Sequence, residues 1–313
     1  MVSEKKYNRR RIPRAIVISA VVAFFVLSFA TTKIVYDRIF ARYDEPVNVP
    51  DELTAMVQER QTVTFSSGEN LLTGYYYEAP RPEQAHGLIL LVPGFSAGGD
   101  DYLWQISELR DFGWGVFTFD PTGTLQSQGE SQVGFSQTIP DLEAALKYVE
   151  NRQCFGYNKL VLVGHSRGAY AACCVLEQSS PVAAVVSISG VNSAMEAIME
   201  LSTKAIGPLS YGNYGFLWLY QAMLFGTDTL EKDASDAISE GSVPVLVVHG
   251  KSDEQIPMEK SSIFAHKEQI DSEQVEFLLC DAGHTDIMYD PDGTANNKLM
   301  QDIHSFLIRS IGE

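Results

Sequence analysis

The sequence predicts an α/β fold, a doubly wound and mostly parallel sheet, with a helical cap insertion and an N-terminal transmembrane helix. Three observations support this prediction. Segments typical of strands alternate with segments typical of helices over residues 61–311, as in a mostly parallel sheet covered on both faces. Unbroken apolar runs at 87–92 and 160–163 are typical of strands buried in such a sheet. The third observation is a basic N-terminus followed by a long apolar run, which is typical of a transmembrane helix.

The first 36 residues differ in kind from the rest of the chain. Six Lys and Arg residues between positions 5 and 14 precede eighteen uncharged residues, 15–32, which are just enough for a helix that spans a bilayer. The basic cluster predicts a cytoplasmic segment 1–14, a transmembrane anchor 15–36 and an extracytoplasmic domain. The alternative is a cleaved signal peptide, whose apolar region is usually shorter. Its best cleavage site, Ser28-Phe29-Ala30, is a poor one, which favours the anchor.

Residues 37–60 are acidic and weakly periodic and contain Pro46 and Pro50, so we expect a linker here, followed by one domain, 61–313. The predicted strands are 61–66 and 71–78, joined by a turn, and then 87–92, 115–119, 160–163, 182–189, 243–248 and 275–280. Helices are predicted directly after Ser166 and at 102–110, 139–151, 258–269 and 296–311.

Residues 191–240 interrupt this alternation, because they contain no clear strand and are rich in aromatic residues and methionine. An insertion of this length in such a domain usually forms a cap. Four of its aromatic residues are candidates for the wall of an apolar substrate pocket, namely Tyr214, Phe216, Trp218 and Tyr220. The alternative is that these side chains only pack the cap onto the core.

The charge and cysteine content exclude several classes of partner. The 313 residues carry a net charge of −17, and without residues 1–36 the balance is 16 basic against 39 acidic residues. A domain of this charge repels nucleic acid, so we expect no nucleic-acid partner. Cys173 and Cys174 are predicted core residues, whereas Cys154 and Cys280 are able to pair only if the fold brings them together. No metal-ligand spacing is found among the Cys and His residues, so we expect no metal.

The stretch Gly164-His165-Ser166-Arg167-Gly168 stands between an apolar strand and a run of small residues typical of a helix. A strand, a sharp turn with a serine at its tip, and a helix form the order of a nucleophile elbow. Glycines on both sides let the backbone turn close to its neighbours while the serine side chain points outward. Ser166 is therefore the candidate nucleophile, with a helix-capping turn serine as the alternative.

A serine hydroxyl needs a base, and the base needs an orienting carboxylate, both from later strand ends. Asp253 follows the strand 243–248 and is the candidate acid, with Glu254 as the next choice. His284 follows the strand 275–280 and is the candidate base. The other histidines fit less well: two lie on predicted helices, His86 and His249 precede the relevant positions, and His165 should point away from Ser166.

A tetrahedral intermediate also needs hydrogen-bond donors for its oxyanion. We expect one donor to be the backbone N–H of Arg167, the residue after the serine. The other should come from the loop after the strand 87–92. Because Pro93 has no N–H and Gly94 lets the backbone turn, Phe95 is the first choice and Ser96 the second.

These motifs occur in the order found in the α/β-hydrolase superfamily, which residues 60–313 resemble: Pro93-Gly94-Phe95, the stretch 164–168, His249-Gly250…Asp253 and Asp281-Ala282-Gly283-His284. The resemblance implies an eight-stranded, mostly parallel sheet, a cap after the sixth strand and no cofactor. Within the superfamily, the chain looks most like the monoglyceride-lipase and serine-aminopeptidase-like hydrolases. The loop 120–131 departs from the family's D-x-R-G-x-G-x-S pattern, with Thr122 where arginine is common and extra residues before the final Gly-x-Ser.

Together these features predict a membrane-anchored serine hydrolase that cleaves carboxylic esters, lipid-like or small, through an acyl-enzyme. The expected partners are the ester substrate and, through the N-terminal helix, the membrane. Two alternatives stay open. One is a peptidase or amidase with the same three residues, and the other is a catalytically silent, membrane-tethered binding domain.

Overall fold

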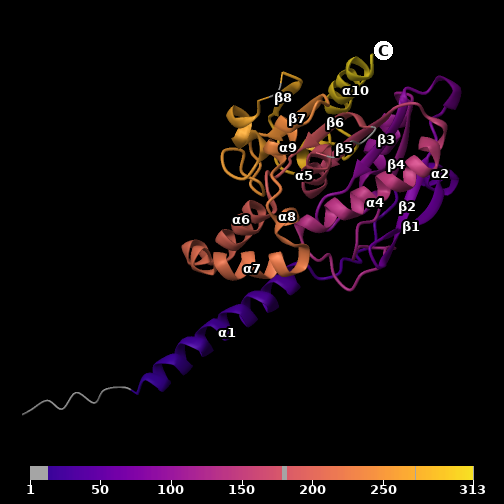
Figure 1. Cartoon of the computed structure of the whole chain (residues 1–313). Coiled ribbons are helices and arrows are strands. Elements are labelled where there is room, and N and C mark those ends of the chain that lie inside the picture. Colours follow the sequence, from indigo (N-terminus) through magenta and orange to yellow (C-terminus); the bar gives the residue numbers. More distant parts are fainter. Residues whose placement is uncertain (1–12, 178–181, 272, 313) are drawn as a thin grey trace, which may run out of the picture.

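The structure, a computed structural model, describes residues 13–177, 182–271 and 273–312 (Figure 1). At its centre is an eight-stranded sheet in the order β1-β2-β4-β3-β5-β6-β7-β8. Strand β2 is antiparallel to its two neighbours, and the other neighbouring pairs are parallel, which confirms the predicted sheet. The strands are β1 (Gln61–Ser67), β2 (Asn70–Tyr77), β3 (Gly87–Val92), β4 (Trp114–Phe119), β5 (Leu160–His165), β6 (Val182–Ile188), β7 (Val245–Gly250) and β8 (Val275–Cys280).

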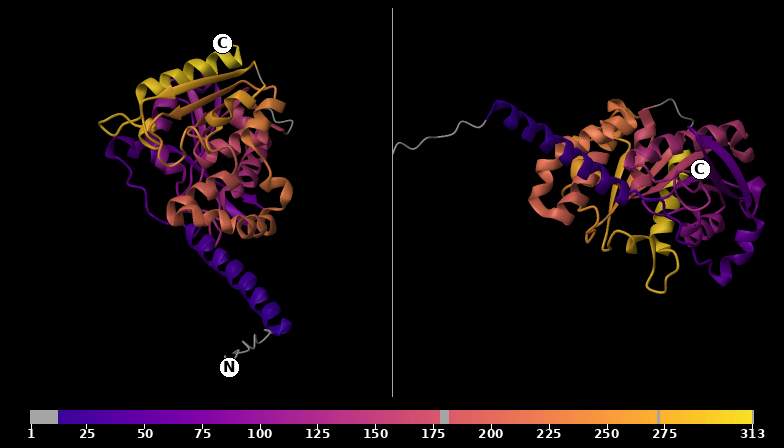
Figure 2. Two further views of the ribbon diagram at one scale, coloured as in Figure 1. Left: turned by 90° about the vertical axis from the view of Figure 1, so that its left-hand side faces the viewer. Right: turned by 90° about the horizontal axis from the view of Figure 1, so that it is seen from below.

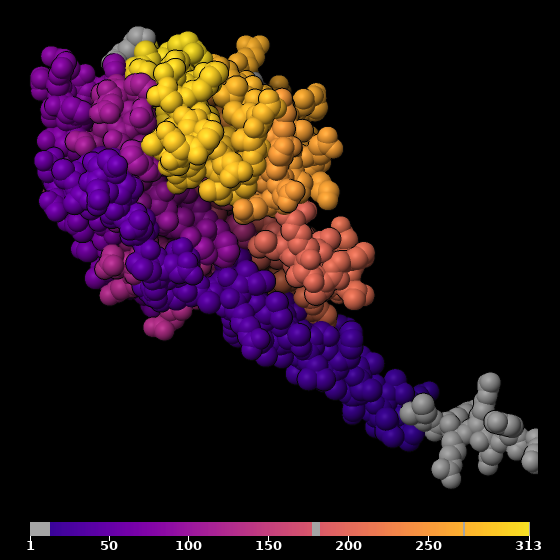
Figure 3. Space-filling model, turned by 180° about the vertical axis from the view of Figure 1, so that it is seen from behind, coloured from indigo at the N-terminus to yellow at the C-terminus, as the bar shows by residue number. Residues whose placement is uncertain are grey.

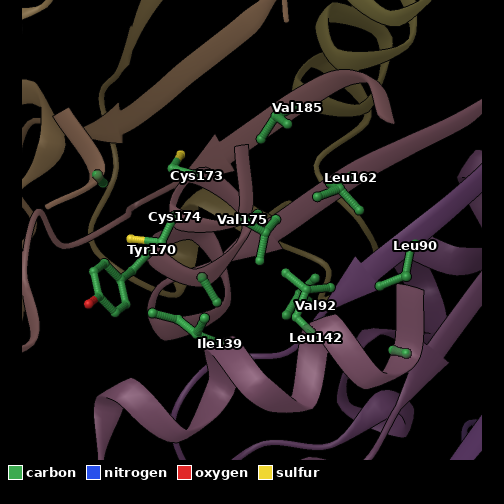
Figure 4. Packing of buried hydrophobic residues seen from close by; sticks show 14 of the residues in the cluster. Leu90, Val92, Ile139, Leu142, Leu162, Tyr170, Cys173, Cys174, Val175 and Val185 are labelled. Atoms are coloured by element: carbon green, nitrogen blue, oxygen red, sulfur yellow. The ribbon is translucent and has the colours of Figure 1, made fainter. Parts of the chain in front are cut away.

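Side chains alternate along each buried strand, so the sheet has two apolar faces. A layer of helices covers each face. On β3, Leu88 and Leu90 belong to one hydrophobic cluster, and Ile89 and Leu91 belong to the other. The first cluster includes α4 (Thr138–Asn151), α5 (Arg167–Cys174) and α9 (Ala234–Glu240), and Figure 4 shows α4 and α5 residues gathered against the strands. The second includes α3 (Leu103–Asp111) and α10 (Asn297–Ile311).

The cysteines pack as small apolar side chains. Cys173 and Cys174 are fully buried in the first cluster, as predicted. All four cysteines are free thiols, so Cys154 and Cys280 do not form the bond that the sequence left open.

The cap insertion lies between β6 and β7, at the position implied by the resemblance. It consists of α6 (Ala194–Ile206), the 3-10 helix η7 (Gly207–Asn213), α7 (Tyr214–Phe225) and the short α8 (Thr227–Leu230). The cap was predicted to extend over residues 191–240, but its last part, α9, lies in the main domain, where it packs on α5 in the helix layer.

The N-terminal helix α1 (Arg14–Ile39) has 26 residues and projects from the domain beside the cap (Figures 1, 2 and 3). It is long and apolar enough to cross a membrane, and its apolar part is almost entirely exposed. Most of the predicted cytoplasmic segment, residues 1–12, lies outside the described residues. The last turns of α1 reach the domain, where Tyr36 and Phe40 are buried in the first cluster.

The structure differs from the linker expected at 37–60. Residues Ala41 and Tyr43 form β-bridges to Ser131 and Thr124 of the main domain. The guanidinium of Arg42 donates to three backbone carbonyls of the loop 125–129. A short helix, α2 (Thr54–Glu59), and the turn before it bury two further side chains in the second cluster. These contacts are made with distant parts of the chain and leave no periodic pattern in the sequence. The acidic, proline-containing segment 37–60 therefore looked like a free linker.

Two other predicted elements differ. The helix expected at 258–269 is only a 3-10 helix, Ile263–Gln269, which starts where Ser262 accepts a hydrogen bond from the Ala265 N–H. Strand β7 begins at Val245 rather than at 243, because Pro244 has no N–H to donate to the sheet.

Candidate active site

The nucleophile elbow joins β5 to α5 and holds Ser166 in a strained conformation, with φ 55° and ψ −118°. The two glycines of the motif are required by close backbone contacts. A Cβ on Gly164 would lie 2.4 Å from the carbonyl oxygen of Gly168, and a Cβ on Gly168 would lie 2.1 Å from that of Val92. Glycine is the residue that fits at both positions, so the turn predicted from the sequence is formed.

The three candidate catalytic side chains form one hydrogen-bonded chain. His284 Nε2 lies 2.9 Å from Ser166 Oγ, and His284 Nδ1 lies 2.7 Å from Asp253 Oδ2. Because a carboxylate only accepts hydrogen bonds, Nδ1 carries the proton and Nε2 is left to accept the serine hydroxyl. The residues come from the ends of β5, β7 and β8, at the carboxyl edge of the parallel sheet.

Asp253 is held as a carboxylate by hydrogen bonds on both oxygens. Its Oδ1 accepts the N–H groups of Gln255 and Ile256 at 2.9 and 2.8 Å, while Oδ2 faces His284. Burial alone would raise the pKa of Asp253, but the hydrogen bond and charge of His284 outweigh it, so this pKa is below its usual value. The alternative acid, Glu254, is exposed and contacts Lys204 through its backbone carbonyl.

The ring of His249 supports the same loop. Its Nε2 donates to the carbonyl of Ile256 at 3.0 Å and lies 3.5 Å from Asp253 Oδ2. Burial lowers the pKa of His249, so the ring is neutral at pH 7 and shapes the loop without placing a second positive charge beside Asp253.

Ser166 and His284 line a pocket of about 250 Å³, together with the loop 94–97 after β3. Within this loop, the Ser96 N–H donates to the side chain of Gln132 at 3.0 Å. Among the described residues, the backbone N–H groups of Phe95 and Arg167 have no hydrogen-bond partner. Of the two loop residues proposed for the oxyanion, Phe95 is therefore the one whose N–H is uncommitted.

The side chain of Arg167 is buried beneath this loop. Its Nη2 lies 3.4 Å from the carbonyl oxygen of Gly94, and its guanidinium lies 5.7 Å from the ring of Phe95. Burial lowers the pKa of Arg167 to about 10, which still leaves it charged at pH 7. A buried cation on a loop carbonyl fixes the loop that precedes Phe95.

The sequence missed a second hydrogen-bonded chain, and its expectation that His165 points away from Ser166 is wrong. The ring of His165 lines the same pocket, with its centroid 5.1 Å from that of His284. His165 Nε2 donates to the His284 carbonyl at 3.2 Å, so Nδ1 accepts the Tyr102 hydroxyl proton at 2.9 Å. The Tyr102 oxygen in turn accepts the Gly94 N–H at 3.0 Å.

This second chain ties His284 to the loop 94–97, which we call the oxyanion loop after its predicted role, through one tyrosine. Burial lowers the pKa of His165 to about 4, so the ring is neutral at pH 7, as the donor and acceptor roles require. The only signal in the sequence was the histidine next to the serine; nothing marked Tyr102, which sits at the start of α3.

The structure places the four cap residues predicted as pocket wall elsewhere. The ring of Phe216 packs on that of Phe25 in α1 at 5.8 Å, and Tyr220 is buried against the same helix. Tyr214 and Trp218 line a separate pocket on the cap. Aromatic content alone did not show that α7 packs along α1, because the two helices are far apart in the sequence.

The loop 120–131 has a structural role here. Thr122, which stands where arginine is common, bonds the buried Asp141 through its N–H and its hydroxyl, both at 2.8 Å. Asp120 accepts the Tyr75 hydroxyl at 2.8 Å and the Gly99 N–H at 3.0 Å. These bonds fix the loop against β2 and the chain after β3.

Comparisons with known proteins agree with this architecture. A family model described as the alpha/beta hydrolase fold matches residues 87–212. The isoprenylcysteine alpha-carbonyl methylesterase ICME of Arabidopsis thaliana is 28% identical over 269 residues, 79% of this chain and 56% of that protein. The chain thus spans little more than half the length of that relative. The uncharacterized protein YfhR of Escherichia coli strain K12 is 26% identical over 304 residues, 94% of each chain.

Among solved structures, the esterase Pf2001 of Pyrococcus furiosus has a TM-score of 0.66 at 18% sequence identity. The similarity covers 88% of this chain and 100% of that one. At this identity the likeness concerns the fold. The family match over the strands and turn that carry Ser166, joined to the same fold over nearly the whole domain, shows that the chain has the α/β-hydrolase fold.

Proposed function

We propose that this protein is a membrane-anchored serine hydrolase that cleaves carboxylic esters through an acyl-enzyme. The family and the fold support a hydrolase in general. The observation that carries the finer proposal is the unbroken hydrogen-bonded chain from Ser166 through His284 to Asp253, beside two uncommitted backbone N–H groups.

In the proposed reaction, Ser166 Oγ attacks the acyl carbon while His284 Nε2 takes the hydroxyl proton. Asp253 stabilises the imidazolium that forms, and the N–H groups of Phe95 and Arg167 bind the oxyanion. The tetrahedral intermediate then breaks its bond to the alcohol, which leaves with the proton from His284. A water molecule repeats these steps on the acyl-enzyme and releases the carboxylic acid and free Ser166.

Ester cleavage is favoured over amide cleavage by what surrounds the site. The methylesterase named above supports an ester substrate. A peptidase that binds the free amine of a peptide needs a carboxylate near the nucleophile, for which the acidic residues of the cap are the candidates. None of them lines the pocket of Ser166, and the carboxylate of Asp101, which does line it, already accepts the Gly98 N–H at 2.7 Å. Glu196, Glu231 and Asp233 line the separate cap pocket that also contains Trp218.

The membrane part of the proposal is supported by how α1 meets the domain. Its apolar part is almost entirely exposed, yet the helix also contacts α7, with Phe29 and Tyr220 ring centroids 5.9 Å apart. A helix that both spans the membrane and packs on the fold favours an anchor that stays attached over a signal peptide that is cleaved. The basic N-terminus supports a cytoplasmic start and an extracytoplasmic domain.

The test uses the full-length chain in detergent micelles and its Ser166→Ala variant. Both are treated with a fluorophosphonate probe and assayed on p-nitrophenyl esters of increasing chain length and on a panel of aminoacyl amides. We expect labelling and ester turnover in the unmodified chain and neither in the variant. Labelling with amide turnover alone would move the assignment to a peptidase or amidase. Absence of labelling and turnover in the unmodified chain would favour the silent binding domain.

A further inference from the structure

A second cavity, of about 470 Å³, lies between α1 and the cap and is separate from the pocket of Ser166. Three helices line it. Its wall on α1 is a single face, with residues recurring every three or four positions: Phe24, Leu27, Ser28, Thr31, Val35 and Ile39. One face of α6 forms the opposite wall through Ile198, Ser202, Ala205 and Ile206, and Leu217 of α7 completes it. We call this cavity the α1–cap groove.

The groove is mainly apolar. Its only polar lining groups are hydroxyls and one amide, and no charged side chain lines it among the described residues. Sixteen residues of α1, from Phe24 to Ile39, run along it, which corresponds to about 22 Å at 1.5 Å per residue. The groove is thus long and lined mainly by apolar side chains, which suits a hydrocarbon chain.

The depth of the groove in a bilayer follows from the charged residues of α1. The uncharged run ends at Lys33, which pairs with Asp37 one turn later. Asp37 also accepts the hydroxyl of Tyr220 at 2.6 Å, so a lysine, a carboxylate and a tyrosine meet at one level of the helix. Such groups gather at the membrane–water interface. The lower end of the groove, at Phe24 and Leu27, then lies about 9–14 Å below that level, inside the outer leaflet.

The cap is held at the same depth. The ring of Phe216 contacts that of Phe25 at 5.8 Å, and the side chain of Asn213 lies 2.8 Å from the Thr32 hydroxyl. The edge of the cap around these contacts exposes large apolar side chains, with Leu209 79% and Tyr211 68% exposed. Figure 3 shows the cap beside the part of α1 that enters the domain. An exposed apolar edge beside a spanning helix is typical of a surface that dips into lipid.

We propose that the α1–cap groove binds one acyl chain of an outer-leaflet membrane lipid, with η7 and the start of α7 immersed in the leaflet. This inference rests on the membrane anchoring of the proposed function. A leaflet of hydrocarbon is about 15 Å thick, so a groove of about 22 Å extends from the acyl region to the domain above it. At its upper end, the Tyr36 ring packs on Phe40 at 4.6 Å, and Phe40 packs on Phe95 at 5.3 Å. A bound chain is therefore held two ring contacts from the oxyanion loop.

The test uses the full-length protein in nanodiscs of phosphatidylcholine, in which a small fraction of the lipid carries a diazirine at the end of one acyl chain. After irradiation, mass spectrometry locates the modified residues. We expect modification of the α6 face at Ile198 and Ala205, in addition to the lipid-exposed start of α1. A lipid with the diazirine in its headgroup should leave the α6 face unmodified.

Ala205→Trp fills the groove and should reduce α6 modification at least fivefold, while modification of residues 16–22 of α1 stays unchanged. Leu219→Trp is the matched control, because Leu219 is exposed on α7 outside the groove and the variant should behave as the unmodified chain. Fluorophosphonate labelling of each variant reports a folded active site.

Modification of α1 without modification of α6, or α6 modification that Ala205→Trp leaves unchanged, would overturn the groove while the anchor stands. Loss of α1 and α6 modification together, with fluorophosphonate labelling intact, would overturn the anchor and the groove and leave the hydrolase assignment in place.

Discussion

Replacing Tyr102 by phenylalanine removes one hydroxyl from the centre of the site without touching the three candidate catalytic residues. That hydroxyl accepts the Gly94 N–H and donates to His165 Nδ1, and all three groups are buried. A buried N–H left without an acceptor costs about 1–3 kcal/mol. Because Gly94 directly precedes Phe95, part of this energy holds the oxyanion donor in position.

If about 1.4 kcal/mol of this hydrogen-bond energy no longer stabilises the transition state, kcat falls about tenfold. The substrate pocket keeps its shape, so we expect KM to change little. The rate of fluorophosphonate labelling should fall in parallel with kcat, because labelling uses the same donors. A role confined to stability would lower the melting temperature and leave both rates unchanged.

The matched control is Tyr289→Phe. Tyr289 lines the same pocket, but its hydroxyl donates to the Asp101 carbonyl at 3.0 Å and makes no contact with the oxyanion loop. Both variants are compared on one soluble p-nitrophenyl ester, with melting temperature measured alongside. A Tyr102→Phe enzyme within about twofold of the unmodified chain, or a Tyr289→Phe enzyme equally slow, would refute the positioning role.

Three further predictions follow from the geometry of the site. Asp253→Asn should lower kcat about 10⁴-fold while the protein stays folded, because the amide favours the wrong histidine tautomer. Ester hydrolysis rates and a thermal melting curve of the variant test this. The pKa of His165 is lowered to about 4, so between pH 6.5 and 4 the unfolded chain binds a proton that the folded protein does not. The stability that His165 contributes is therefore present above pH 6.5 and lost as the pH falls to 4. His165→Gln should flatten the pH dependence of the free energy of urea unfolding in that range. Gly168→Ala should give no folded protein, since its Cβ would lie 2.1 Å from the Val92 carbonyl; recovery of a soluble, probe-reactive variant would contradict the close packing of the elbow.

The main domain was predictable because its signals are local. The bounds predicted for β3 and β8 match the structure to the residue, since a short, mainly apolar run between turn residues is typical of a strand. The order of Ser166, Asp253 and His284 along the chain, with glycines where the backbone turns, was enough to select these residues. The structure then brings them into hydrogen-bonding distance.

What the sequence did not show depends on contacts between distant segments. The role of Tyr102 arises from a loop and a histidine 63 residues away, and no local pattern marks it. The cap aromatics looked like pocket wall because the sequence does not say which helix lies beside α7. The segment 37–60 looked like a tether because its buried residues are few and unevenly spaced.

Arg42 lies directly after α1, and its guanidinium holds the loop 125–129. This contact fixes the position of the domain relative to α1. A domain on a slack tether samples many heights and orientations above the membrane. Here the last turn of α1 is part of the folded core, which fixes the helix axis relative to the sheet. With α1 in a membrane as proposed, Ser166 is kept at one height and one tilt relative to the lipid surface. Selection among substrates would depend on how far each reactive ester stands from the bilayer as well as on the shape of the pocket.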